Sequence, residues 1–158
     1  MSDLRVGIGV DAHAFEEGVP LVLGGVDIAY PEGLAGHSDG DVLAHALIDA
    51  VLGAAGLGDI GSLFPSWEER FRGVSSLVLL EEAYAQVREA GWKLVNADCV
   101  LIGQEPKIAP QRDEMCRRLQ AAIGEGEVNV RATTTDALGF TGRKEGLAAN
   151  AVALLERR

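Results

Sequence analysis

Hydrophobic residues alternate with polar or small residues along several short stretches of the chain, as they do in strands that bury one face. The strands predicted in this way cover residues 4–10, with a continuation as far as residue 15, residues 92–103 and residues 128–132. Two apolar runs on either side of Gly24-Gly25 predict a β-hairpin over residues 21–28. Residues 147–155 fit either a helix or a strand, because alanine favours a helix locally and sheet pairing can override that preference.

In other stretches the hydrophobic residues recur every three to four positions, which is typical of helices. The predicted helices cover residues 39–56, 75–90 and 111–123. Ser38 or Asp39 is the expected N-cap of the first helix, and Ser75 or Ser76 that of the second, because side-chain oxygens accept from the free N–H groups of a first turn. The first helix is apolar on almost every face, so we expect it to be buried on more than one side.

Composition narrows the class of protein. The 158 residues, 47% of them hydrophobic, predict one globular domain over residues 1–158. A net charge of -10 argues against a nucleic-acid partner and against an anionic membrane surface. No signal peptide or apolar stretch of spanning length is apparent, so the expected compartment is the cytoplasm, or the plastid stroma for a plant chain that has lost a transit peptide. Cys99 and Cys116 are more typical of small buried apolar groups than of a disulfide.

All three histidines lie in two short stretches, Asp11-Ala12-His13 and residues 37–45. Asp11 and His13 alternate along the first predicted strand and so project to one face, while His45 lies on the first predicted helix. Together they would form a set of one carboxylate and two imidazoles. Three protein ligands leave a tetrahedral zinc ion one open position, which is typical of catalytic sites. The alternative is three solvent-facing or capping histidines that never meet.

Two carboxylates flank His45 on the same helix. Asp41, His45 and Asp49 are four residues apart and therefore share one stripe of the helix surface. An imidazole ligand usually donates its second ring N–H to a carboxylate or carbonyl, so Asp41 and Asp49 are candidates for orienting His45.

Other motifs offer groups for phosphate chemistry, and each has a structural alternative. The loop at residues 56–66 offers free amides and Asp59, or it is a plain connector with a solvated carboxylate. Thr133-Thr134-Thr135-Asp136 follows a strand and suits phosphate or a hard cation, although turn and capping chemistry is common for such residues. By contrast, Gly7-x-Gly9-x-x-Ala12 lacks the strand–turn–helix context of a dinucleotide-binding motif.

Taken together, five motifs closely resemble the 2-C-methyl-D-erythritol 2,4-cyclodiphosphate synthase family over essentially the whole chain. The motifs are Asp11-x-His13, HSDGDVLAHA at 37–46, GDIGSLFP at 58–65, ATTTD at 132–136 and GFTGR at 139–143. The resemblance implies an enzyme of non-mevalonate isoprenoid synthesis, a phosphorus–oxygen lyase that converts 4-diphosphocytidyl-2-C-methyl-D-erythritol 2-phosphate into the cyclic diphosphate and CMP. It also implies an α+β domain with a mixed β-sheet covered by helices on one face, assembling as a homotrimer with the sheets facing the central axis and active sites at subunit interfaces.

The resemblance also implies roles for individual residues. Asp11, His13 and His45 match the zinc ligands, and His37 and Thr134 match groups that stabilise the transition state. A second ion, Mg²⁺ or Mn²⁺, would be held by Asp136, which is one methylene shorter than the usual glutamate, so a bridging water is expected there. The implied substrate-binding residues are Asp11, Ala12, His13, His37, Ser38, Asp59, Ile60, Gly61, Phe64, Pro65, Ser66, Trp67, Glu68, Gly103, Gln104, Glu105, Pro106, Lys107, Ile108, Ala109, Thr133, Thr134, Thr135, Asp136, Phe140 and Arg143.

Two other functions are compatible with the same residues. A mononuclear zinc phosphoesterase would use the trio to generate hydroxide, and a non-catalytic trimer stabilised by metal would bind isoprenoid diphosphates as a sensor. Some family members bind an isoprenoid diphosphate in an apolar cavity on the trimer axis, for which Arg143 and Phe140 are candidates here. Val10 stands where an aromatic residue is often found, so this binding stays unassigned.

Overall fold

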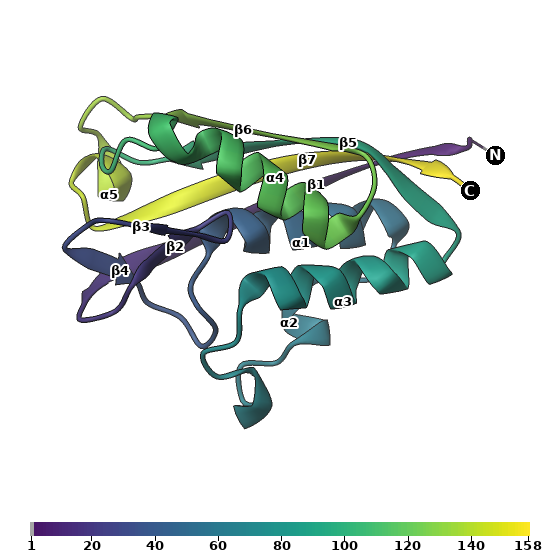
Figure 1. Ribbon diagram of the computed structural model, residues 1–158, viewed down its shortest axis with the longest axis horizontal. Helices are drawn as coiled ribbons and strands as arrows, with labels where there is room; N and C mark the ends of the chain where they lie inside the picture. The colour runs from purple at the N-terminus through teal and green to yellow at the C-terminus, as the bar shows by residue number, and fades with distance from the viewer. Residues whose placement is uncertain (1) are drawn as a thin grey trace.

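The structure, a computed structural model, describes residues 2–158 and contains a five-stranded mixed sheet with helices against one face (Figure 1). The strand order is β4-β1-β7-β5-β6, in which only β5 and β6 pair in parallel. The strands are β4 (Glu32–Leu34), β1 (Leu4–Glu17), β7 (Gly146–Arg157), β5 (Trp92–Ile102) and β6 (Glu127–Thr133). The ambiguous segment at residues 147–155 is therefore a strand, and its place at the centre of the sheet, paired on both edges, overrides the helix preference of its alanines.

Three long helices form the second layer. They are α1 (Val42–Ala55), α3 (Ser76–Glu89) and α4 (Arg112–Ile123). Helix α1 packs against β1 and β7, α4 packs against β6, and α3 packs against both helices. Almost every residue of α1 is buried, as its apolar pattern predicted. Two short helices, α2 (Ile60–Leu63) and α5 (Gly139–Gly142), interrupt segments that the sequence indicated as glycine-rich loops.

The predicted hairpin is confirmed as β2 (Leu21–Leu23) and β3 (Val26–Ile28), with Gly24 and Gly25 at positive φ in the turn. Ser75 caps α3, one of the two serines expected there, by accepting from the backbone N–H of Leu77. Among the described residues both cysteines are free, as expected. No helix in residues 2–158 is long and apolar enough to cross a bilayer.

The start of α1 differs from the prediction. The N-cap is Asp41 rather than Ser38 or Asp39, and the helix begins at Val42. Asp41 accepts from the N–H of Ala44 in the first turn and from the N–H groups of Gly24 and Gly25 in the hairpin turn. Its carboxylate therefore joins α1 to the β2–β3 hairpin, an attachment that the sequence of the helix alone does not reveal.

The opposite face of the sheet carries exposed apolar side chains. Side chains at alternate positions of β1 point away from α1, and those of Val6, Ile8 and Val10 are 61–70% exposed. Val152 on β7 and Val95 on β5 are exposed as well. A run of β-branched residues on three adjacent strands is an apolar surface that no helix of residues 2–158 covers.

Candidate metal centre and phosphate pockets

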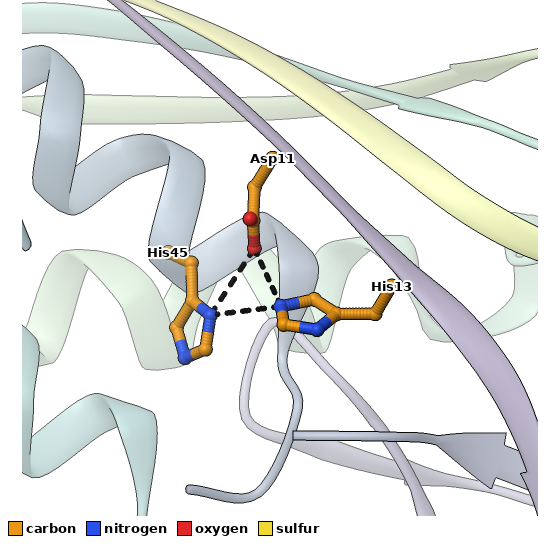
Figure 2. Close-up of side chains that lie close together, drawn as sticks. All are labelled: Asp11, His13 and His45. Atoms are coloured by element: carbon orange, nitrogen blue, oxygen red, sulfur yellow. Dashed lines mark hydrogen bonds and ion pairs between the residues drawn. The ribbon is translucent and has the colours of Figure 1, made fainter. Parts of the chain in front are cut away.

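Asp11, His13 and His45 come together between β1 and the first turn of α1 (Figure 2). Asp11 Oδ2 lies 2.8 Å from His13 Nε2 and 3.1 Å from His45 Nδ1, and the two imidazole nitrogens are 3.2 Å apart. The two β1 side chains point to the helical face because they are two residues apart on a strand, and α1 brings His45 to meet them. The predicted convergence of these three residues is confirmed. The alternative of histidines that never meet is therefore wrong for His13 and His45.

These three donor atoms fit a divalent metal ion. In a tetrahedral zinc site with bonds of 2.0–2.1 Å, neighbouring ligand atoms lie about 3.3 Å apart. The observed separations are slightly shorter, so small side-chain movements would open them to that value. One carboxylate oxygen and two imidazole nitrogens also suit zinc and other divalent transition metals in chemical type. The set has three protein ligands, which is the number found in catalytic zinc sites.

The ionisation of the cluster also favours a cation. Burial alone would raise the pKa of Asp11, but the hydrogen bonds to His13 and His45 outweigh it and lower that pKa to about 2. The hydrogen bond to Asp11 raises the pKa of His13 against the opposing effect of burial. The carboxylate thus keeps its negative charge and draws a positive charge toward it.

Neither carboxylate predicted to orient His45 does so. Asp41 is the N-cap described above, and Asp49 accepts from the backbone N–H of Ile60 at 2.7 Å. Burial, together with the charge of Asp39, raises the pKa of Asp41 to about 6. The prediction rested on the shared helical stripe of Asp41, His45 and Asp49. In the structure, backbone N–H groups, rather than the imidazole, donate to both carboxylates.

The second nitrogen of His45 instead meets hydroxyl groups. His45 Nε2 lies 2.8 Å from Ser76 Oγ, at the start of α3, and 3.0 Å from Ser38 Oγ. Ser76 Oγ in turn donates to Asp39 Oδ1. Sequence analysis placed Ser76 only among candidate helix caps, and no local signal connects it to a histidine 31 residues earlier.

A cavity of about 300 Å³ opens beside the three metal-ligand candidates. The predicted residues lining it are Asp11, His13, His37, Ser38, His45, Ile60, Gly61, Phe64, Ser66 and Trp67, and Phe71 and Leu79 add apolar walls that the sequence did not indicate. His37 Nε2 lies 2.9 Å from the backbone oxygen of Glu68, which joins the loop before α1 to the segment after α2.

Four predicted residues near this cavity do not line it. Ala12 is exposed on the opposite side of β1, and Pro65 and Glu68 flank residues that do line the cavity. Asp59 is exposed and caps α2 by accepting from the N–H and hydroxyl of Ser62, which lower its pKa. The exposure of Asp59 agrees with the structural alternative of a solvated carboxylate, and its capping of α2 was not predicted.

A second, smaller cavity of about 200 Å³ lies at the edge of the sheet formed by β5 and β6. It is lined by Leu101, Gly103, Pro106, Lys107, Ile108, Ala109, Arg112, Ala132, Thr133 and Thr134. Lys107 and Arg112 give this cavity two cations, of which only Lys107 was predicted. Two cations and two hydroxyls in one cavity suit an anion such as a diphosphate.

The remaining predicted residues lie around the second cavity in contacts within the chain. Gln104 Oε1 accepts from the N–H of Ala137, and Glu105 pairs with Lys144 at 3.0 Å. Thr135 Oγ1 donates to the backbone oxygen of Leu138, which is turn chemistry. Asp136 Oδ1 accepts from Thr134 Oγ1 at 3.3 Å, and Arg143 pairs with Glu145 at 2.7 Å. The side chain of Phe140 on α5 is 44% exposed.

The two cavities are separate within one chain. His13 pairs with Leu147 of β7, the next residue of β7 pairs with Ile102 of β5, and Ile102 pairs with Thr133 of β6. Three strand spacings of 4.7–4.9 Å therefore separate β1 from β6, about 14 Å in all. Asp136 accordingly lies outside the group formed by Asp11, His13 and His45.

Comparison with known proteins decides the family. The model of the YgbB family matches residues 4–156. The chain belongs to the YgbB family. It is 53% identical over 154 residues to the 2-C-methyl-D-erythritol 2,4-cyclodiphosphate synthase of Moorella thermoacetica, a match that covers 96% of this chain and 94% of that protein.

Solved structures of this family share the fold. A 2C-methyl-D-erythritol-2,4-cyclodiphosphate synthase solved in a form bound to CDP aligns with a TM-score of 0.87 and 41% identity, over 96% of this chain and all of that one. The bifunctional IspDF from Campylobacter jejuni aligns with a TM-score of 0.94 and 45% identity, over 98% of this chain and 42% of that longer chain. The resemblance stated from the sequence motifs is thus confirmed for this YgbB member.

Proposed function

We propose that this YgbB protein is a cyclodiphosphate synthase that converts 4-diphosphocytidyl-2-C-methyl-D-erythritol 2-phosphate into 2-C-methyl-D-erythritol 2,4-cyclodiphosphate and CMP. The observation that carries the proposal is the convergence of Asp11, His13 and His45 beside a cavity, in a chain whose relatives bear that enzyme's name. A related synthase was solved with CDP, which supports a cytidine-linked substrate.

The reaction is an intramolecular phosphoryl transfer. An oxygen of the 2-phosphate forms a bond to the β-phosphorus, the bond from that phosphorus to the bridging oxygen breaks, and CMP leaves with the electron pair. Such a step needs alignment of the two phosphates and neutralisation of their charge more than it needs a covalent intermediate. The enzyme would therefore be classed as a phosphorus–oxygen lyase.

The residues of the two cavities suit these tasks. Asp11, His13 and His45 would hold zinc or a similar divalent ion, which supplies a Lewis acid for a phosphate oxygen. His37, which lines the first cavity, would lie beside the methylerythritol phosphate and help to stabilise the transition state. In the second cavity, Lys107 and Thr134 would hold the diphosphate by charge-assisted and neutral hydrogen bonds.

A second divalent ion, Mg²⁺ or Mn²⁺, would bind between the diphosphate and Asp136. Asp136 is the carboxylate next to Thr134 and has a left-handed backbone conformation with φ of 51°. Its side chain is short, so a bridging water would complete the contact. In a chain with net charge -10, the two ions would offset most of the repulsion toward a highly charged substrate.

We further propose that active sites form between copies of this chain in a homotrimer. The two cavities lie about 14 Å apart across the sheet of one chain by its strand spacing, which is too far for one compact site to include both. The exposed apolar face with Val6, Ile8 and Val10 is suited to pack against the same face of other copies. Such packing would bring the first cavity of one copy toward the second cavity of another.

Incubation of the purified protein with zinc, magnesium and the cytidine substrate, followed by phosphorus NMR, tests the function. The synthase gives a cyclic diphosphate and CMP in equal amounts. Linear phosphates would identify the phosphoesterase alternative, and unchanged substrate with both metals present would favour the sensor. His45→Ala and Thr134→Ala separate the cavities, because each removes activity while only the first removes the metal.

A further inference from the structure

Two linked polar groups, the Asp39 carboxylate and the Ser76 hydroxyl, reach His45 from the side away from the metal-ligand atoms. Ser76 Oγ donates to Asp39 Oδ1 and lies 2.8 Å from His45 Nε2, while His45 Nδ1 faces Asp11 at 3.1 Å. Asp39 Oδ2 also accepts from the backbone N–H of Ser76 at 3.0 Å. Ser76 is fully buried, so water has no access to replace its hydroxyl.

The available hydrogens fix the donor and the acceptor of each hydrogen bond between Asp39, Ser76 and His45. The Ser76 hydroxyl has one hydrogen, and the carboxylate oxygens of Asp39 can only accept. Both oxygens of Asp39 already accept from backbone N–H groups, of Asp41 and of Ser76, so this side chain is held as an acceptor. The Ser76 hydrogen therefore goes to Asp39, and the lone pairs of Ser76 Oγ are left to face His45 Nε2.

If Nε2 carried no hydrogen, its lone pair would face a lone pair of Ser76 Oγ at 2.8 Å, which would be repulsive. Nε2 must therefore carry the hydrogen and donate it to Ser76 Oγ. With the hydrogen on Nε2, a neutral His45 has its free lone pair on Nδ1. That atom is the one that points at Asp11 and His13.

We propose that Asp39 and Ser76 are positioning residues for the metal centre: Asp39 orients the Ser76 hydroxyl, and Ser76 accepts from His45 Nε2 and presents Nδ1 to the ion. This inference rests on the proposed metal role of the trio but not on the reaction that it catalyses. It replaces the helix-borne carboxylates Asp41 and Asp49 with a relay from the loop before α1 and the start of α3.

Ser38 is a second hydroxyl within reach of His45 Nε2, at 3.0 Å. It is partly exposed and lines the first cavity, whereas Ser76 is buried and held by Asp39. The oriented and desolvated hydroxyl is the stronger partner of the two. Ser38 would then be free to donate to a ligand in the cavity.

The test measures zinc binding by the metal-free full chain in competition with a chromophoric chelator, with zinc alone and no substrate. Ser76→Ala and Asp39→Asn should each weaken zinc binding by roughly 10–100-fold, the usual effect of losing an outer partner of a ligating histidine. Because Asp39 acts through Ser76, the double variant should bind zinc about as weakly as Ser76→Ala alone.

Ser75→Ala is the matched control. Ser75 is the neighbouring serine and caps the same helix through the N–H of Leu77, but it makes no contact with His45. Its loss should leave zinc affinity unchanged even though the start of α3 is weakened. A merely structural role for Ser76 would make the two serine variants alike in zinc affinity.

A second readout follows the hydrogen itself. In zinc-loaded protein labelled with ¹⁵N-histidine, the Nε2–H proton of His45 should exchange slowly with water, and Ser76→Ala should accelerate the exchange. Zinc affinity within about twofold of wild type in Ser76→Ala, with unchanged exchange, would overturn the proposal, as would a wild type that binds no zinc. A protein that shows these effects but forms no cyclic diphosphate would instead refute the proposed reaction and leave the positioning role standing.

Discussion

Gly9 of β1 lies directly against the backbone oxygen of Ala46 in α1, so closely that a Cβ on this glycine would be 1.8 Å from that oxygen. Gly7 has the same relationship to Ala50, one helical turn further on, with a corresponding distance of 2.1 Å. The two glycines of the sequence Gly7-x-Gly9 therefore do not form a nucleotide-binding turn, in agreement with the prediction from their sequence context. They allow α1 to approach the strand, and His45 precedes Ala46 by one residue.

Gly9→Ala should therefore loosen the metal centre and the fold together. The added methyl must push α1 away from β1, and overpacking of this kind typically costs about 1–3 kcal/mol of unfolding free energy. The shift separates His45 from Asp11 and His13, so zinc affinity should fall. Urea unfolding and zinc competition measure the two effects.

Gly53→Ala is the control for that substitution. Gly53 lies on α1 near the same strand, but a Cβ there would come no closer than 3.9 Å, to the backbone oxygen of Ile8. Alanine favours a helix over glycine by about 1 kcal/mol, so this variant should be as stable as wild type or more so. Equal effects of the two substitutions would contradict the role given to Gly9.

The half of the candidate metal centre that lies on β1 was predictable because its pattern is local, whereas its meeting with His45 stayed open on spacing alone and was expected from the resemblance of the motifs. Asp11 and His13 are two residues apart on a strand, so spacing assigned both to one face, and His45 was placed on a long apolar helix by the periodicity of its neighbours. The main helices, the hairpin and most strands followed from periodicity for the same reason.

Contacts between distant segments were not predictable. Ser76 reaches His45 across 31 residues, and a serine at the start of a helix carries the same local signal whether or not a histidine lies beside it. The central strand β7 was ambiguous because its alanines gain their strand conformation from pairing with β1 and β5. The separation of Thr134 from the metal centre likewise depends on strand order, which motifs do not encode.

Two histidines of the first cavity should respond differently to replacement. His45→Gln removes a proposed metal ligand and should lower zinc affinity by more than the 10–100-fold typical of an outer partner. His37→Gln removes a residue that lines the cavity but lies outside the ligand group, so it should keep zinc and lose cyclisation. Metal analysis after dialysis and phosphorus NMR give the two readouts. Loss of zinc in His37→Gln would mean that the ligand set is different.

Asp41→Ala tests the attachment of α1 to the β2–β3 hairpin. The substitution leaves the N–H groups of Gly24, Gly25 and Ala44 without their acceptor. Each buried unpaired group costs about 1–3 kcal/mol, so the free energy of unfolding should fall by roughly 3 kcal/mol or more. Asp27→Ala, an exposed change in the same hairpin, should stay within about 0.5 kcal/mol of wild type. Similar losses in both variants would argue against the capping role.

Tyr84 predicts a dependence of stability on alkaline pH. Burial, aided by its hydrogen bond to Glu125, raises the pKa of Tyr84 to about 12 from an ordinary value of 10.0. Between these two values the folded protein keeps a phenol proton that the unfolded chain has lost, so the unfolding free energy falls as pH rises from 10 to 12. Tyr84→Phe has no phenol to ionise, so its unfolding free energy should not show this fall. The unfolding free energy of the variant should therefore rise relative to that of wild type between pH 10 and 12. A difference that stays constant with pH would contradict the assignment.

Val6→Lys tests whether the uncovered sheet face joins copies of the chain. Val6 is 70% exposed in one chain, so a lysine fits there without disturbing the core. In a trimer that buries this face, three such charges would be brought together without partners, and the assembly should dissociate. Light scattering after size exclusion measures the mass. Each separated chain should still bind zinc through Asp11, His13 and His45, whereas cyclisation should be lost, because the proposed site takes Lys107 and Thr134 from another copy. Val78→Lys, an exposed position on α3, should leave both mass and activity unchanged. Full cyclisation by a monomeric Val6→Lys chain would show that one copy contains a complete site.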